Sequence, residues 1–115
     1  MFKSMVRNPN YSMVQDVSPE ELKAQLDRVL LVDVRQAEEF TGELGHIENA
    51  QLHPLNSLPE ALGSLSKDKT IVFVCRSGGR SAQATAFALE SGYSNVYNLA
   101  GGMLLWNQLQ FAVIK

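Results

Sequence analysis

The sequence contains very little cysteine and histidine: of its 115 residues, one is a cysteine and two are histidines. A single cysteine forms no internal disulfide, and two histidines without a second thiol show no spacing typical of metal ligands. The sequence therefore predicts neither a disulfide-stapled fold nor a metal site, and we expect no bound cofactor.

Long apolar runs and an excess of basic charge are also missing. No stretch approaches the ~18 consecutive apolar residues that cross a bilayer, and residues 1–7 lack the apolar core of a secretion signal. The formal net charge is -2 at pH 7, so the chain has no basic field to attract nucleic acid. We therefore expect a cytoplasmic protein without membrane or nucleic-acid partners.

Proline, glycine and sequence repeats stay at ordinary levels, and the hydrophobic fraction of 45% is typical of a chain that folds. A chain of 115 residues has room for one buried core. We expect a single domain over residues 12–109. A loose lead-in at residues 1–11 precedes it, and a tail of undetermined form at residues 110–115 follows it.

What the sequence does contain is an alternation of helix and strand signals. Ser18 as N-cap, Pro19 at the first helical position and Glu21 as partner in a capping box predict a helix that runs to about Asp27. The apolar run at residues 29–34 is typical of a strand buried on both faces. Further helices are expected at residues 36–40, 57–65, 80–91 and 103–109, and further strands at residues 51–53, 70–74 and 95–99. This alternation predicts an α/β domain with a parallel sheet.

The single cysteine, Cys75, directly follows one of these strands and begins the loop Cys75-Arg76-Ser77-Gly78-Gly79-Arg80. Ligands of open parallel sheets bind at the carboxyl ends of the strands. Adjacent glycines let backbone N–H groups converge on an anion, and the following helix adds the positive end of its dipole. These features favour a reactive thiolate that needs no separate base. A buried cysteine serving as a small hydrophobe would explain neither the glycines nor the arginines.

The sequence resembles single-domain rhodaneses, a family of sulfurtransferases, from about Ser12 to Leu109. Four stretches carry the resemblance: Asp33-Val34-Arg35 with Glu39-Phe40, Gly45-His46-Ile47 with Ala50, Cys75 to Ser81, and Leu99-Ala100-Gly101-Gly102 with Trp106. The resemblance implies a three-layer α/β domain, in which helices cover both faces of a small parallel sheet.

The resemblance also implies that Cys75 is the nucleophile. It attacks a sulfane donor such as thiosulfate, releases sulfite and holds the sulfur as a persulfide, which a small thiol, a thiol-bearing protein or cyanide then accepts. The backbone N–H groups of residues 76–80 would hold the persulfide. Arg76 and Arg80 are candidates for binding the charged group of the donor, and Arg80 is also a candidate for fixing the loop by hydrogen bonds.

Other residues of the resembling stretches are assigned supporting roles. Asp33 and Arg35 lie at a strand end and are expected to hold the loops by an ion pair or hydrogen bonds, with a direct substrate role for Arg35 left open. His46 is expected to be a structural hydrogen-bond partner rather than a base. The glutamates at residues 38–39 are expected on a solvated or ion-paired short helix, and residues 101–102 in a tight turn.

Two other functions stay open. A sulfur-carrier or partner-docking module would receive persulfide sulfur from another protein and scarcely turn over thiosulfate alone. A cysteine-based phosphatase or arsenate reductase is the weaker alternative. Phosphatases of related fold place their arginine six positions after the cysteine, whereas Arg80 follows Cys75 by five.

Overall fold

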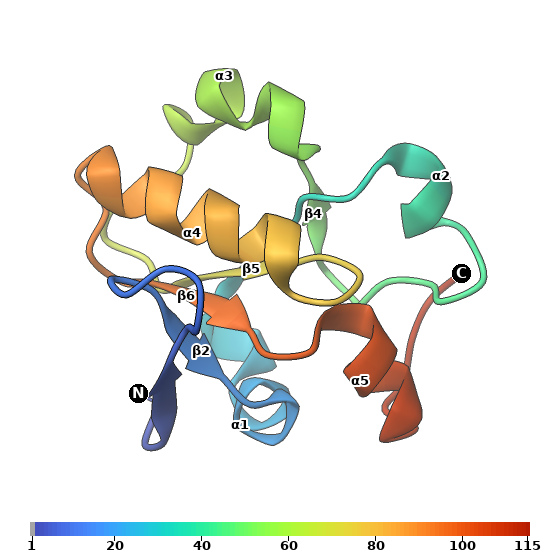
Figure 1. The fold of residues 1–115 in the computed structure, drawn as a ribbon. Helices are drawn as coiled ribbons and strands as arrows, with labels where there is room; N and C mark the ends of the chain where they lie inside the picture. Colours follow the sequence, from blue (N-terminus) through green and yellow to red (C-terminus); the bar gives the residue numbers. More distant parts are fainter. Residues whose placement is uncertain (1) are drawn as a thin grey trace.

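The computed structural model describes residues 2–115, which form a sheet with helices on both of its faces (Figure 1). The sheet has six strands in the order β1-β2-β6-β5-β3-β4. Their bounds, in this spatial order, are Met5–Arg7, Gln15–Val17, Val96–Leu99, Ile71–Val74, Leu30–Asp33 and Gln51–Leu52. All neighbours are parallel except β1, which pairs antiparallel with β2.

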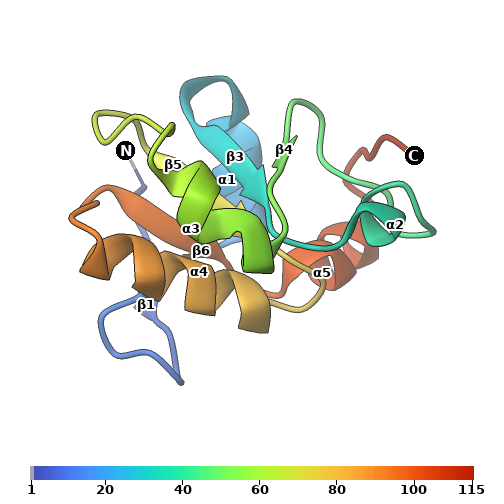
Figure 2. The ribbon, with the colours of Figure 1, turned by 90° about the horizontal axis from the view of Figure 1, so that it is seen from above.

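The helices lie in two layers. Their bounds are α1 Pro19–Ala24, α2 Ala37–Phe40, α3 Leu58–Leu62, α4 Gly79–Glu90 and α5 Gly102–Gln108. The core divides accordingly: α3 and α4 pack on one face of the sheet, and α1 and α5 on the other (Figures 1 and 2). The three-layer α/β arrangement expected from the sequence is confirmed.

Strand β5 shows why the central strands have continuous apolar runs. Its side chains alternate between the two faces: Ile71 and Phe73 join the core under α3 and α4, whereas Val72 and Val74 join the core over α1 and α5. All four are fully buried. Because both faces are covered, the strand needs no polar side. The residue after the strand, Cys75, is also buried.

Helix α1 begins as predicted but ends earlier. The Ser18 side chain accepts a hydrogen bond from the Glu21 N–H at 3.1 Å. The second hydrogen bond expected of a capping box, from the Ser18 N–H to the Glu21 side chain, was a wrong prediction. The Glu21 carboxylate instead accepts hydrogen bonds from the backbone N–H groups of Lys3 and Ser4. The helix ends at Ala24 and is followed by a 3₁₀ turn, Leu26–Arg28.

The N-terminal segment differs from the loose lead-in expected at residues 1–11. Residues 5–7 form the edge strand β1, held by its backbone pairing with β2. Its side chains are all exposed, so no apolar alternation marks it in the sequence. Phe2 and Asn8, on either side of β1, are buried, and the Phe2 ring lies edge-on to Tyr97 at 5.2 Å. The segment is therefore part of the folded domain.

The C-terminal segment is also attached to the domain. The indole N–H of Trp106 donates to the carbonyl of Ala112 at 3.0 Å, and the Phe111 ring lies edge-on to the Trp106 ring. Ile114 forms an isolated antiparallel bridge with His46. Within residues 2–115, no helix is long and apolar enough to cross a membrane.

Candidate active site

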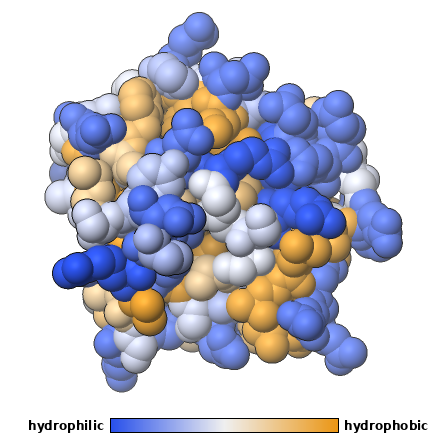
Figure 3. All heavy atoms as spheres, in the orientation of Figure 1, coloured by the Kyte–Doolittle hydropathy of each residue, from blue (hydrophilic) through white to orange (hydrophobic). Residues whose placement is uncertain are grey.

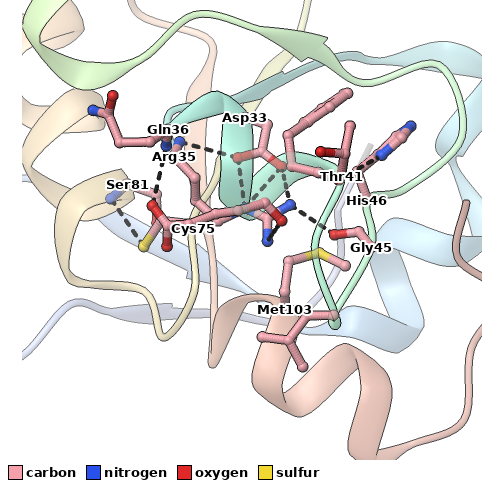
Figure 4. Close-up of polar contacts among 12 residues, drawn as sticks. Asp33, Arg35, Gln36, Thr41, Gly45, His46, Cys75, Ser81 and Met103 are labelled. Atoms are coloured by element: carbon pink, nitrogen blue, oxygen red, sulfur yellow. Dashed lines mark hydrogen bonds and ion pairs between the residues drawn. The ribbon is translucent and has the colours of Figure 1, made fainter. Parts of the chain in front are cut away.

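Cys75 lies at the carboxyl end of β5, and its side chain is 1% exposed. Three donors lie within hydrogen-bond distance of its sulfur: the backbone N–H of Gly78 at 3.1 Å, that of Ser81 at 3.3 Å and the Ser81 hydroxyl at 3.2 Å. The close-up in Figure 4 marks the contact between the backbone nitrogen of Ser81 and this sulfur. Donors arranged around a buried atom stabilise negative charge there, so the arrangement suits a thiolate.

The loop returns to the sulfur because Gly78 has a φ of 105°, which an L side chain rarely adopts. Helix α4 begins at the next residue, and the first N–H groups of a helix have no intrahelical acceptor. Those of Gly79 and Arg80 therefore remain available to an anion, with the positive end of the helix dipole behind them. The loop at the strand end thus has the geometry that the sequence predicts for it.

The outer side of the same loop is held by helix α5. The N–H groups of Met103 and Leu104 donate to the carbonyls of Cys75 and Arg76 at 2.8 and 2.9 Å. This approach requires Gly102, which has a φ of 55°: a Cβ there would overlap the Cys75 carbonyl oxygen and lie 2.6 Å from that of Arg76. The residues at 101–102 form the expected turn. In addition, Gly102 sets the position of the Cys75 backbone.

Arg80 is paired with a carboxylate of helix α2. Its two terminal nitrogens lie 2.7 and 2.8 Å from the two oxygens of Glu39. These hydrogen bonds lower the pKa of Glu39 to about 2, and the same hydrogen-bonded contact raises the pKa of Arg80. Arg80 therefore ties the loop to α2, which is one of the two roles that the sequence suggested for it.

Arg76 has a different environment. Its side chain is exposed, and within residues 2–115 no carboxylate lies at ion-pair distance from it. It lines a hollow of about 400 Å³ between the loop, α2 and α5. The other lining residues are Arg35, Glu38, Glu39, Gly42, Glu43, Leu44 and Leu104. Figure 3 shows apolar side chains gathered over α5, where Leu104 and Leu109 are exposed.

Asp33 and Arg35 form an ion pair, one of the contacts expected from the sequence, and both side chains are buried. The guanidinium contacts both carboxylate oxygens, with Nη2 at 2.8 Å from Oδ2 and Nε at 2.9 Å from Oδ1. It also donates to the carbonyls of Gly45 at 2.8 Å and Glu39 at 3.2 Å, so it connects β3 to α2 and the following loop (Figure 4). A buried pair adds little net stability, and its main effect here is to position α2.

His46 makes structural contacts, as expected. Its Nδ1–H donates to the carbonyl of Phe40 at 2.8 Å, and the two rings stack with centroids 3.7 Å apart. In the described part of the chain, no group of three or more His, Cys, Asp or Glu side chains is placed to hold a metal ion.

The sequence assigned no role to three polar residues behind the Cys75 sulfur: Ser81, Asn98 and Asp16. Ser81 and Asn98 are buried, and Asp16 is half-buried. Two of them had a signal in the sequence. Ser81 ends the stretch that resembles rhodaneses, and Asn98 is an amide in a central, otherwise largely apolar strand.

A model of the rhodanese-like domain family matches residues 18–109. The chain belongs to this family. The matched range begins at the N-cap of α1 and ends just after α5, so it contains the Cys75 loop and leaves β1 and β2 outside. The resemblance to rhodaneses seen in the sequence is confirmed.

Relatives of this rhodanese include proteins of similar length. A protein of Allochromatium vinosum named as a sulfurtransferase is 38% identical over 97 residues, covering 82% of this chain and 89% of that protein. The structure of the human single-domain sulfurtransferase TSTD1 is 34% identical with a TM-score of 0.69, covering 81% of this chain and 95% of that one. MoeZ of Mycobacterium tuberculosis, named as a probable adenylyltransferase/sulfurtransferase, is longer. It is 38% identical over 95 residues, which cover 78% of this chain and 24% of MoeZ.

Proposed function

We propose that this protein is a sulfurtransferase that moves sulfane sulfur from thiosulfate through a Cys75 persulfide to a thiol or cyanide. The observation that carries the proposal is the Cys75 sulfur itself, which is buried at the end of β5 and lies within hydrogen-bond distance of three donors of the loop and helix α4. Membership of the rhodanese-like family and the names of two relatives of similar length support it.

In the first half-reaction, the Cys75 thiolate attacks the outer sulfur of thiosulfate. The bond within thiosulfate breaks, and its electron pair leaves with sulfite. The negative charge of the new persulfide lies on its outer sulfur, which the N–H groups at the start of α4 would hold.

The charged end of thiosulfate would be bound by Arg76. Arg76 is exposed beside the hollow, whereas both terminal nitrogens of Arg80 already bind Glu39. The engagement of Arg80 also favours sulfur transfer over phosphatase chemistry, in which the loop arginine must bind the phosphate.

A sulfur-carrier function is the second candidate. MoeZ contains a related domain as about a quarter of a larger protein, which is the arrangement expected of a domain that relays sulfur within a longer chain. The hollow beside Arg76 includes Leu44 and the exposed Leu104, so its mouth has apolar surface for a protein acceptor.

The test is to incubate the protein with thiosulfate and measure its intact mass and the thiocyanate formed after cyanide is added. We expect the mass to rise by one sulfur atom, with Cys75→Ser gaining none and Ser91→Ala, at the far end of α4, behaving as the wild type. Equal gain by Cys75→Ser, or no gain by the wild type, would overturn the proposal. Loading by a protein persulfide but not by thiosulfate would favour the carrier.

A further inference from the structure

A chain of polar side chains leads from the Cys75 sulfur to the N-terminal hairpin β1–β2. The Ser81 hydroxyl lies 3.2 Å from the sulfur and 2.5 Å from Oδ1 of Asn98. The Asn98 amide donates to Oδ1 of Asp16 at 2.9 Å, and the Asn8 amide donates to the same carboxylate at 3.0 Å. Asp16 and Asn8 lie outside the range that the family matches.

The Ser81 hydroxyl has one proton and two acceptors. Asn98 has a fixed orientation because its Nδ2 donates to Asp16 and to the carbonyl of Gly78, so its Oδ1 faces Ser81 and can only accept. The hydroxyl therefore donates either to the Cys75 sulfur or to Asn98. Ser81 is 0% exposed and Asn98 is 1% exposed, so bulk water does not substitute for either bond.

The charge on the Cys75 sulfur changes during the proposed reaction, and this inference rests on that reaction. The sulfur is negative in the free thiolate and uncharged in the persulfide, where the outer sulfur bears the charge. When an acceptor thiolate attacks the outer sulfur, a new sulfur–sulfur bond forms and the old one breaks. The electron pair of the broken bond returns to Cys75. The stronger acceptor for the Ser81 proton therefore alternates between Asn98 and the sulfur.

We propose that Ser81 is a second catalytic residue, whose hydroxyl turns from Asn98 to the Cys75 sulfur as sulfur leaves the persulfide. Asn98 and Asp16 are positioning residues. Asn98 accepts the hydrogen bond of the Ser81 hydroxyl while the sulfur is uncharged, and Asp16 holds Asn98 in the orientation that this requires. The hairpin takes part because Asn8, which is 7% exposed, holds the Asp16 carboxylate from the other side.

The hairpin and the active loop line the same hollow. Its volume is about 310 Å³, and its lining includes Asn8, Asp16 and Asn98 together with Ser77, Gly78 and Gly79 of the loop. The N-terminal segment is therefore a part of this active site and not only an addition to the sheet edge.

The experiment compares Ser81→Ala with Thr85→Val. Thr85 lies one turn later on α4, is equally buried, and its hydroxyl donates to the carbonyl of Ser81 rather than to the sulfur. Each protein is loaded with thiosulfate, and the rate of sulfur transfer to excess cyanide is then measured alone. We expect transfer to slow about tenfold in Ser81→Ala, the effect of a lost hydrogen bond to a charged group, and to stay within twofold of the wild type in Thr85→Val. Equal rates for the two variants would overturn the proposal.

A second measurement keeps this test independent of the proposed function. Methyl methanethiosulfonate attaches a methylthio group to Cys75, and dithiothreitol removes it. Because the Cys75 sulfur is buried, dithiothreitol reaches the outer sulfur, so Cys75 again leaves as a thiolate. Ser81→Ala should slow this release about tenfold as well. If the wild type takes no sulfur from thiosulfate, the proposed function fails. If Ser81→Ala releases the methylthio group at the wild-type rate, the role of Ser81 is refuted.

The positioning role is tested by a double-mutant cycle between Asp16→Leu and Ser81→Ala. Asp16→Leu should slow sulfur release a few-fold relative to the wild type. Asp16→Asn, which keeps an oxygen that can accept from Asn98, should retain most of the wild-type rate. Asp16→Leu should have no effect in the Ser81→Ala background, because Asp16 acts through Ser81. The same slowing in both backgrounds would show an unrelated structural effect and overturn the assignment of Asp16.

Discussion

Replacing Gly102 by alanine tests whether the turn before α5 sets the position of the nucleophile. The residue has a φ of 55°, and for an L side chain this left-handed conformation costs ~1–2 kcal/mol. A Cβ would also overlap the Cys75 carbonyl oxygen and crowd that of Arg76. Relief requires the loop to move away from α5, which breaks the two hydrogen bonds from Met103 and Leu104, worth ~0.5–1.5 kcal/mol each.

The sum of these effects is a loss of about 2–5 kcal/mol in the free energy of unfolding for Gly102→Ala. At about 4 °C per kcal/mol, Tm should fall by about 8–20 °C. Thermal unfolding followed by circular dichroism measures this change. Because a displacement near 1 Å at a reacting group costs about a hundredfold in rate, we expect kcat/KM for thiosulfate to fall by about that factor at a temperature where the variant is folded.

Gly63→Ala is the matched control for Gly102→Ala. Nothing lies within 4 Å of a Cβ built at Gly63, and its φ of -60° is open to any residue. This substitution should leave activity unchanged and raise stability slightly, since alanine restricts the unfolded chain. The reasoning would be refuted if Gly102→Ala kept wild-type activity, or if it lost stability without a change in kcat/KM.

Three further predictions concern charge and the core. Arg76→Gln should lower kcat/KM for thiosulfate about tenfold, while the transfer from a loaded protein to cyanide stays the same. Glu39→Gln should free Arg80 to bind anions and lower KM for thiosulfate; an unchanged KM would show that Arg80 does not reach the donor. Glu39→Gln should also cost less than ~1 kcal/mol of stability, since the pair is partly exposed. Arg80 holds the pKa of Glu39 at about 2, below the 4.5 of the unfolded chain. The stability contributed by this ion pair is therefore fully present above about pH 4.5 and disappears as pH falls through 2. Denaturant unfolding of the wild type and Glu39→Gln across that pH range measures the contribution. Phe73→Ala should cost ~3–5 kcal/mol in denaturant unfolding, because its fully buried ring fills the core under α4.

The central part of the fold was predictable because its signals are local. The continuous apolar run of β5, the alanine-rich stretch of α4 and the Ser18 cap each identify an element within a few residues. The edge strand β1 was missed because it is three residues long and all its side chains are exposed. It is held by backbone pairing with β2, which leaves no mark on side-chain pattern.

The amino-acid sequence by itself determined the loop, the likeness to rhodaneses and the choice of Cys75, because these depend on residues adjacent in the chain. Only the tertiary structure decided which side chains meet there. Arg80 pairs with Glu39 across 41 positions, and Asn98 binds Asp16 across 82. Such pairs depend on strand order, which places β6 between β2 and β5, and local periodicity does not encode strand order. For that reason the sequence singled out Cys75 but not the residues that surround its sulfur.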